Sequence, residues 1–194
     1  MHVDGSNCFD PLTVVGLTGT LTSSDNVSLT SASLDEQVTT FSGSITDTDF
    51  TGTYVISGGC AGGDKGTVTG TKIPQITGTL NGTFTTSGKN TFDLVAQVTQ
   101  GGGSAEGSFG ITGTVTFATP CFSSGTILSG TFPSASFIIG VSVALAIQTN
   151  NGTIAFRGTT DPGTGEISGY YTVVGGTCDD TGTTVLVGSS TWDY

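Results

Sequence analysis

The chain has 194 residues, of which 35% are hydrophobic, 32 are glycine and only 10% are charged. Four Lys and Arg residues stand against 15 Asp and Glu residues, so the formal net charge at pH 7 is -11. Nucleic acids and anionic membrane surfaces are bound through clustered basic side chains, so we exclude both as partners. No stretch approaches the roughly 20 consecutive apolar residues of a membrane-spanning helix, and we expect no membrane span.

Apolar and polar residues alternate along much of the chain, and this period of two is typical of strands with one buried face. In chain order the alternation covers residues 26–34, 38–46, 91–100, 108–117, 153–160 and 166–174. Turn signals rich in Gly, Asn, Asp and Ser separate these segments, and the acidic stretch "SLDEQ" at 33–37 is also expected to be a turn. The most apolar stretch, "SFIIGVSVALAI" at 136–147, is expected to be one fully buried strand. The pattern predicts an all-β, antiparallel meander of about thirteen strands.

Five segments recur in the same order in the two halves of the chain. The first copy opens with "CF" at residue 8 and reaches "GTYVISGGC" at 52–60; the second opens with "CF" at residue 121 and reaches "GYYTVVGGTC" at 169–178. The repeat predicts a partial unit of about five strands in residues 1–75 and a complete unit of about eight strands, a barrel or a sandwich, in residues 76–194. A partial unit has open sheet edges, so we expect self-association or a cell-surface partner at those edges.

Four cysteines are present, at Cys8, Cys60, Cys121 and Cys178. An even number of cysteines in an acidic chain that is poor in lysine predicts disulfide bonds and a secreted protein, or one of the bacterial cell surface or periplasm. The alternative is four buried thiols in a cytosolic protein. Each repeat has one opening and one closing cysteine, and this arrangement predicts the pairs Cys8–Cys60 and Cys121–Cys178.

The segments "GTYVISGGCAGGDKGTVTG" at 52–70, "CFSSGT" at 121–126 and the closing "GTC…TGT" resemble secreted or lipid-anchored, Thr/Gly-rich β-repeat proteins of soil bacteria. The resemblance covers nearly the whole chain, and it implies export with a lipid anchor or linker upstream. The group carries no assigned catalytic residues, so the resemblance implies none here. The stretch "ITGTLNGTF" at 76–84 is also similar to the first strand of avidin-like and lipocalin-like barrels.

Candidate catalytic groups are scarce, because His2 is the only histidine and lies next to the N-terminus. A catalytic triad or a zinc site built on histidines cannot be assembled from it. Paired carboxylates could hydrolyse glycosides, and Asp47 with Asp49 and Asp161 with Glu166 are such pairs. Both pairs fall in predicted turns, where acids usually accept local main-chain hydrogen bonds, so we expect no enzyme.

Calcium is the one metal that the sequence suggests, because Ca²⁺ prefers oxygen ligands in tight turns. No stretch matches a defined calcium loop, and solvated turns are the favoured interpretation. We therefore expect no cofactor, with calcium as the alternative. The candidate calcium ligands are Asp47, Asp49, Asp161, Glu166, Asp179 and Asp180.

A ligand site is predicted around the adjacent Tyr170 and Tyr171, which must point to opposite faces of a strand. One of the two tyrosines, with Trp192 and the only arginine, Arg157, is the candidate rim of a pocket for a small molecule or sugar. The sequence favours a non-enzymatic exported β module for cell-surface structure, assembly or adhesion. The alternative is a β-barrel that binds a small ligand or saccharide.

Overall fold

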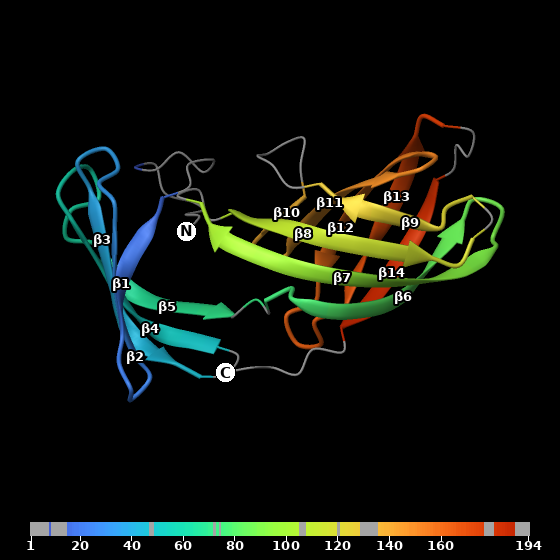
Figure 1. The fold of residues 1–194 in the computed structure, drawn as a ribbon. Coiled ribbons are helices and arrows are strands. Elements are labelled where there is room, and N and C mark those ends of the chain that lie inside the picture. The colour runs from blue at the N-terminus through green and yellow to red at the C-terminus, as the bar shows by residue number, and fades with distance from the viewer. Residues whose placement is uncertain are drawn as a thin grey trace. The chain divides into compact units, whose positions relative to one another are not determined.

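The computed structural model describes residues 8, 15–46, 49–71, 73, 75–104, 108–119, 121–128, 136–176 and 181–188. Within these ranges the chain is all-β and antiparallel and contains no helix, as the alternation predicts (Figure 1). It forms fourteen strands and divides into two compact units, the second of which begins at Ile73. The sequence places its division between residues 75 and 76.

The first unit is a five-stranded antiparallel meander in which each strand pairs with the next along the chain. One face of this sheet carries most of the apolar side chains and the other is mostly Thr and Ser, because successive residues of a strand point to opposite faces. We call this unit the open sheet. Its strands are β1 (Leu17–Leu21), β2 (Asn26–Ser31), β3 (Val38–Ile45), β4 (Asp49–Ser57) and β5 (Lys65–Thr71).

The second unit is an eight-stranded closed barrel with one extra strand. Its strands are β6 (Gly78–Thr86), β7 (Thr91–Gly103), β8 (Ser108–Phe117), β9 (Ser124–Ile127), β10 (Phe137–Ile139), β11 (Ser142–Thr149), β12 (Gly152–Thr160), β13 (Ile167–Val174) and β14 (Thr181–Gly188). The barrel closes because β14 pairs with β6, while β9 and β10 both lie between β8 and β11. The choice between barrel and sandwich is thereby decided in favour of the barrel.

Strands β9 and β10 occupy one position in the barrel wall, one after the other. The main-chain N–H of Ser136 donates to the carbonyl of Leu128 at 3.1 Å, and this bond joins the two ends. The fully buried Ser136 hydroxyl accepts from the N–H of Ala146 at 2.9 Å, so it replaces a main-chain acceptor in the ladder. Residues 129–135, between these ends, lie outside the described residues.

The prediction of one buried strand over residues 136–147 is wrong. The segment turns at Gly140 and continues as a hairpin of β10 and β11, with Ile139 paired to Ser142. Gly140 has φ +53°, in the left-handed region that only glycine adopts without strain. The sequence of such a hairpin resembles that of one buried strand, because both of its arms contribute apolar side chains to the core. The turn expected at residues 33–37 is confirmed, with reciprocal main-chain bonds between Leu34 and Gln37.

The barrel interior is filled by one side chain in two from every strand, and these residues form a single apolar cluster. Phe84 lies at its centre, with its ring 5.2 Å from that of Tyr171 and 5.8 Å from that of Phe117, edge to face in both cases. Such geometry adds stabilisation beyond area burial. Gly158 and Gly169 face each other in the wall, and the strands approach so closely there that a Cβ on either glycine would overlap a carbonyl oxygen of the paired strand. Glycines at such positions permit a sheet to curve sharply.

Candidate functional site

The cysteines form structural cross-links. Cys8 and Cys60 are joined by a disulfide, which confirms that predicted pair. Cys121 is also disulfide-bonded, and its predicted partner, Cys178, lies outside the described residues. A buried amide accompanies the first bridge: the Gln37 side chain donates to the carbonyl of Cys8 at 3.2 Å and accepts from the N–H of Ala61 at 2.8 Å.

The second repeat has a similar amide contact. Asn151, in the turn that joins β11 to β12, donates from Nδ2 to the carbonyl of Cys121 at 3.4 Å. Gln37 precedes β3 in the open sheet much as Asn151 precedes β12 in the barrel. In both units, therefore, a side-chain amide just before the third strand of the sheet (β3 or β12) holds the main chain of the cysteine that opens the repeat.

Three of the acidic residues that the sequence nominates for calcium or glycoside chemistry are described: Asp161 and Glu166 flank the β12–β13 turn, and Asp49 begins β4. Asp161 Oδ1 accepts from the N–H of Gly163 and Thr164, both at 2.8 Å, and from the Thr164 hydroxyl at 3.1 Å. These hydrogen bonds hold the pKa of Asp161 below its usual value, and the carboxylate closes the β12–β13 turn. Asp161 and Glu166 are joined there through the main chain, from Asp161 N–H to Glu166 O.

Of the remaining candidate ligands, only Asp49 is among the described residues. Asp49 begins β4 and accepts from the Thr71 hydroxyl of β5 at 3.4 Å. Asp47, Asp179 and Asp180 lie outside the described residues. Over the part of the chain that the structure describes, no three His, Cys, Asp or Glu side chains are grouped so that they could hold a metal ion.

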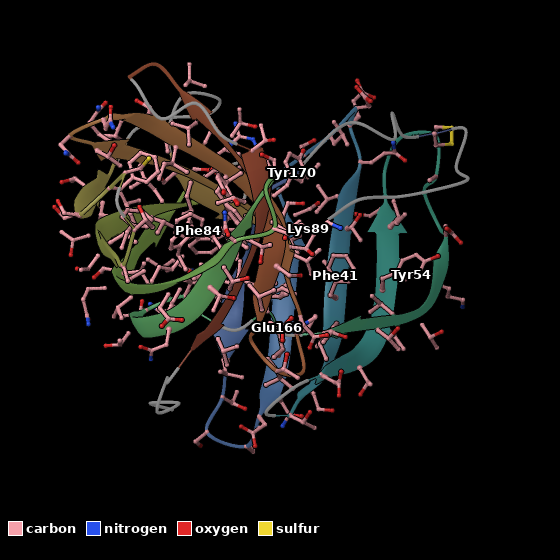
Figure 2. The ribbon with its side chains drawn as sticks, turned by 90° about the vertical axis from the view of Figure 1, so that its right-hand side faces the viewer. Phe41, Tyr54, Phe84, Lys89, Glu166 and Tyr170 are labelled. Atoms are coloured by element: carbon pink, nitrogen blue, oxygen red, sulfur yellow. A yellow bond between two sulfur atoms is a disulfide. The ribbon has the colours of Figure 1, made fainter. Side chains whose placement is uncertain are left out.

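The two adjacent tyrosines lie on opposite faces of the barrel wall. Tyr171 is buried inside the barrel, whereas Tyr170 is 62% exposed on the outside. Arg157 is also exposed and lies directly opposite Tyr170 in the β12–β13 ladder. Tyr170 and Arg157 are therefore neighbours, and the wall separates both from Tyr171 (Figure 2 labels Tyr170). Trp192 lies outside the described residues.

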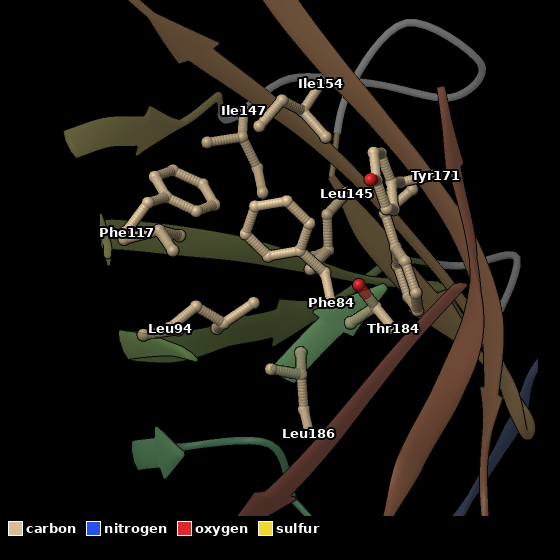
Figure 3. A pocket seen from close by; sticks show the side chains of 12 residues that line it. Phe84, Leu94, Phe117, Leu145, Ile147, Ile154, Tyr171, Thr184 and Leu186 are labelled. Carbon is tan, nitrogen blue, oxygen red and sulfur yellow. The ribbon is translucent and has the colours of Figure 1, made fainter. Parts of the chain in front are cut away.

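The barrel encloses a small apolar cavity of about 30 Å³. Figure 3 shows Phe84 reaching into the centre of the lining, with the hydroxyls of Tyr171 and Thr184 nearby. The other ten lining residues are apolar. A cavity of this size and polarity is suited to staying empty, and it is about a tenth of the roughly 300 Å³ at the lower end of pockets for small-molecule ligands.

The open sheet ends in two strands that each have one partner, β1 with β2 and β5 with β4. Just beyond the two ends of β1, the N–H of Ala32 donates to Gly16 O at 3.0 Å and the N–H of Thr22 donates to Asn26 O at 2.9 Å. Main-chain groups alternate in direction along an antiparallel strand. The main-chain groups that point away from β2 therefore belong to Leu17, Gly19 and Leu21.

Strand β5, at the other edge, also has main-chain groups that point away from its partner. The N–H of Ile56 donates to Asp64 O at 2.8 Å, so even-numbered residues of β5 face β4. Those that point their N–H and C=O groups outward are Thr67, Thr69 and Thr71. Within the described residues, no strand pairs with the outer side of β1 or β5.

Two exposed leucines mark the β1 edge, and no pattern in the sequence singled them out. Every residue of β1 is exposed; Leu21 is 62% exposed and Leu17 37%. Both lie on the apolar face of the open sheet. The available signal was the segment "LTGTL", which lacks the charges and prolines that usually protect an edge strand.

No helix among the described residues is long and apolar enough to cross a membrane. No protein-family model matches the sequence, and no curated protein matches it.

Proposed function

We propose that the protein is a non-enzymatic, exported β module that assembles with a partner through its open sheet. The observation that carries this proposal is the combination, in one sheet, of a half-covered apolar face and two edges that pair with no further strand among the described residues. Unpaired edges are templates for strand addition, in which main-chain hydrogen bonds supply affinity and side-chain contacts supply specificity.

Both edges lack the usual protection against such pairing. Strand β1 has no charged residue and no proline, and the only charged residue of β5 is Lys65 at its first position. Within the described ranges, no other strand forms a ladder with the outer side of either edge. An edge with these properties is suited to pairing with another chain, and it supports assembly as the function.

The barrel supports this choice over the alternative of ligand capture. A saccharide needs several hydrogen-bonding groups, whereas the interior offers two hydroxyls, from Tyr171 and Thr184, among apolar side chains. The cavity of about 30 Å³ is also too small for a drug-sized ligand. We infer that the barrel interior serves as a packed core and that the outer surface and the open sheet carry the function.

Export is supported by the Cys8–Cys60 disulfide, since such bonds persist in oxidising compartments and are rare in the cytosol. The net charge of -11 with few lysines suits a chain that stays in solution until its partner is met. We therefore place the protein at the cell surface, in the periplasm or outside the cell.

The proposal is tested by light scattering of the purified chain over a range of concentrations. We expect concentration-dependent association, because the two edges and the apolar face can pair weakly with those of other copies. The double variant Leu21→Lys with Thr69→Pro should remain monomeric, because it puts a charge on one edge and removes an outward N–H from the other without breaking a ladder bond.

The matched control is Thr30→Lys with Thr69→Ala. It adds the same charge on the exposed Thr/Ser face and keeps the N–H at residue 69, so it should associate like the unmodified chain. Equal association of all three proteins, or none in any of them, would contradict assembly through the open sheet.

A further inference from the structure

We infer that the open sheet is the acceptor half of a second barrel and that its partner is a polypeptide carrying a three-stranded antiparallel meander of the β6–β8 type. This inference rests on the proposed function and identifies the partner of that same surface. In the barrel of this chain, β6, β7 and β8 close the gap between β14 and the position shared by β9 and β10. The open sheet has the remaining five strand positions and lacks these three.

The open sheet and strands β9–β14 have the same internal register. In the open sheet Phe41 of β3 pairs with Tyr54 of β4, and in the barrel Phe156 of β12 pairs with Tyr171 of β13. Figure 2 shows Phe41 and Tyr54 on neighbouring strands of the open sheet. Two residues further along each ladder, glycine faces glycine in both units. The two sheets therefore curve at the same place.

The chain leaves the fourth strand position through a pair of glycines of similar conformation in both units. Gly58 and Gly59 have φ values of +76° and +56°, and Gly175 and Gly176 have values of +75° and +82°. Glycine adopts the left-handed region without strain, so both pairs suit this turn. Each pair directs the chain toward the fifth strand position, β5 in the open sheet and β14 in the barrel.

The first strand position shows what the open sheet lacks. Leu17 of β1 occupies the place in the open sheet that Ile127 occupies in the barrel, and Leu21 occupies the place of Ile138. This equivalence follows from their pairing with corresponding residues of β2 and β11. Ile127 is 2% exposed and Ile138 3%, because β8 and the rest of the barrel cover them. The two leucines are 37% and 62% exposed. The side chains are suited to burial, and no strand among the described residues occupies the place of β8 beside them.

The fifth strand position leads to the same conclusion. Tyr54 pairs with Gly66 of β5 as Tyr171 pairs with Gly182 of β14, and in both pairs a Cβ on the glycine would touch the tyrosine ring. Tyr171 is buried because Phe84 of β6 packs edge to face against it at 5.2 Å. Tyr54 is only partly buried. A partner strand in the position of β6 would place an aromatic ring on Tyr54.

These correspondences specify the register of the complex. In the barrel, Val185 of β14 lies opposite Thr83 of β6. The equivalent of Val185 in the open sheet is Thr69, whose main-chain groups point outward. The partner residue equivalent to Thr83 should therefore lie opposite Thr69, and the one equivalent to Thr85 should lie opposite Thr67.

The test uses the intact chain and, as a probe, a synthetic peptide of residues 75–119, which contains β6, β7 and β8. The chain carries Thr69→Cys and the peptide Thr83→Cys, and mild oxidation traps the complex as a cross-strand disulfide that is quantified by mass spectrometry. We expect this pair to cross-link several times faster than Thr69→Cys with a Thr85→Cys peptide, which should instead prefer Thr67→Cys. A peptide that also carries Phe84→Ala should bind at least about tenfold more weakly, because it loses the ring that packs on Tyr54.

A chain with Val185→Cys serves as the control for the other acceptor. If the peptide cross-links only to Val185→Cys, it has displaced the meander of the barrel, and the inference is wrong. It is also wrong if cross-linking at residue 69 is independent of register, or if the intact chain instead forms a dimer of open sheets that the peptide leaves unchanged. Suppose that the double variant Leu21→Lys with Thr69→Pro does not associate and that no register-specific cross-link forms. Assembly through the open sheet is then supported, and the inference of a meander partner is wrong.

Discussion

The open sheet and strands β9–β14 of the barrel are built on the same ladder, yet their side chains are covered to different degrees. Tyr171, Leu145 and Ile127 are each at most 4% exposed in the barrel. Tyr54 and Leu29, at corresponding positions of the open sheet, are partly exposed, and Leu17 is exposed. The difference follows from three strands, β6 to β8, that only the barrel possesses.

This comparison shows how a strand pattern can specify a sheet without specifying its closure. Register and curvature arise within the five strands, from paired aromatic residues and facing glycines. Burial of the inner face requires a separate meander. Substitutions at equivalent positions of the two units should therefore differ in effect mainly because only the barrel has the meander.

The largest effect is expected from the disulfide of the open sheet. Cys8→Ser with Cys60→Ser should lower the free energy of unfolding of that unit by about 4 kcal/mol, because the bridge closes a loop of 52 residues and restricts the unfolded chain. The barrel contains neither cysteine. Calorimetry should show one transition moving to lower temperature and one unchanged; two shifted transitions would mean that the units do not unfold separately.

Replacing an inward-facing leucine by alanine should lower the free energy of unfolding more in the barrel than in the open sheet. Leu145→Ala removes a 4% exposed side chain from a closed core and should cost about 2–5 kcal/mol of unfolding free energy. Leu29→Ala, at the corresponding position opposite Phe41, should cost about 1 kcal/mol, because that face is already partly exposed. Chemical denaturation of both variants measures the difference, and equal costs would contradict the distinction between the two units.

Proline should distinguish a paired strand from an edge strand. The N–H of Thr86 donates to Asn90 O, so the odd-numbered residues of β6 face β14, and Val185 exchanges main-chain bonds with Thr83. Val185→Pro should cost at least about 1–3 kcal/mol for the acceptor left without its donor. Thr69→Pro should change the free energy of unfolding by no more than about 0.5 kcal/mol. A large loss at residue 69 in the isolated chain would mean that β5 already has a second partner.

The smallest effect concerns the hairpin turns and their dependence on pH. The pKa of Asp161 is held below the unfolded value of 3.8 by hydrogen bonds from Gly163 and Thr164. Its contribution to stability is therefore present above about pH 3.8 and is lost as the pH falls through the lower, folded pKa. The corresponding turn of the open sheet is closed by the Thr46 hydroxyl, which does not titrate.

The check is an NMR titration of the main-chain amides at Gly163 and Thr164. Their signals should shift in acid with a midpoint below 3.8, and Asp161→Asn should remove the shift. The amide of Asp49, which bonds the Thr46 hydroxyl, serves as the comparison within the open sheet. A midpoint at or above 3.8 would contradict the lowered pKa of Asp161.

Much of the fold could be predicted from local sequence, because the period of two and the turn residues act over a few positions. The hairpin turn at 33–37 was predictable for this reason. The Cys8–Cys60 pair was predictable from the internal repeat, which gives each half one opening and one closing cysteine. Ser136 and Gly140 show where such reasoning fails. A hydroxyl that replaces a main-chain acceptor and a turn inside an apolar run leave no signal in the period of two, although both lie within one local hairpin.

The candidate site was less predictable, because exposure depends on which strands are missing. Leu17 and Leu21 carry the same local pattern as the buried residues of the barrel, and only the pairing of the sheets reveals them as an uncovered edge. Likewise, the adjacency of Tyr170 and Tyr171 places them on opposite faces, but only barrel closure decides which one is inside.

Amide hydrogen exchange at the two fifth strand positions tests directly whether the open sheet is the acceptor for a meander of the β6–β8 type. In the isolated chain, the outward N–H groups of Thr67 and Thr69 should exchange rapidly, while those of Thr183 and Val185, which face β6, should be protected. Addition of the peptide of residues 75–119 should protect Thr67 and Thr69 and leave the barrel unchanged. Rapid exchange at Thr67 and Thr69 at saturating peptide, or strong protection at both before peptide is added, would contradict the assignment of the open sheet as an acceptor.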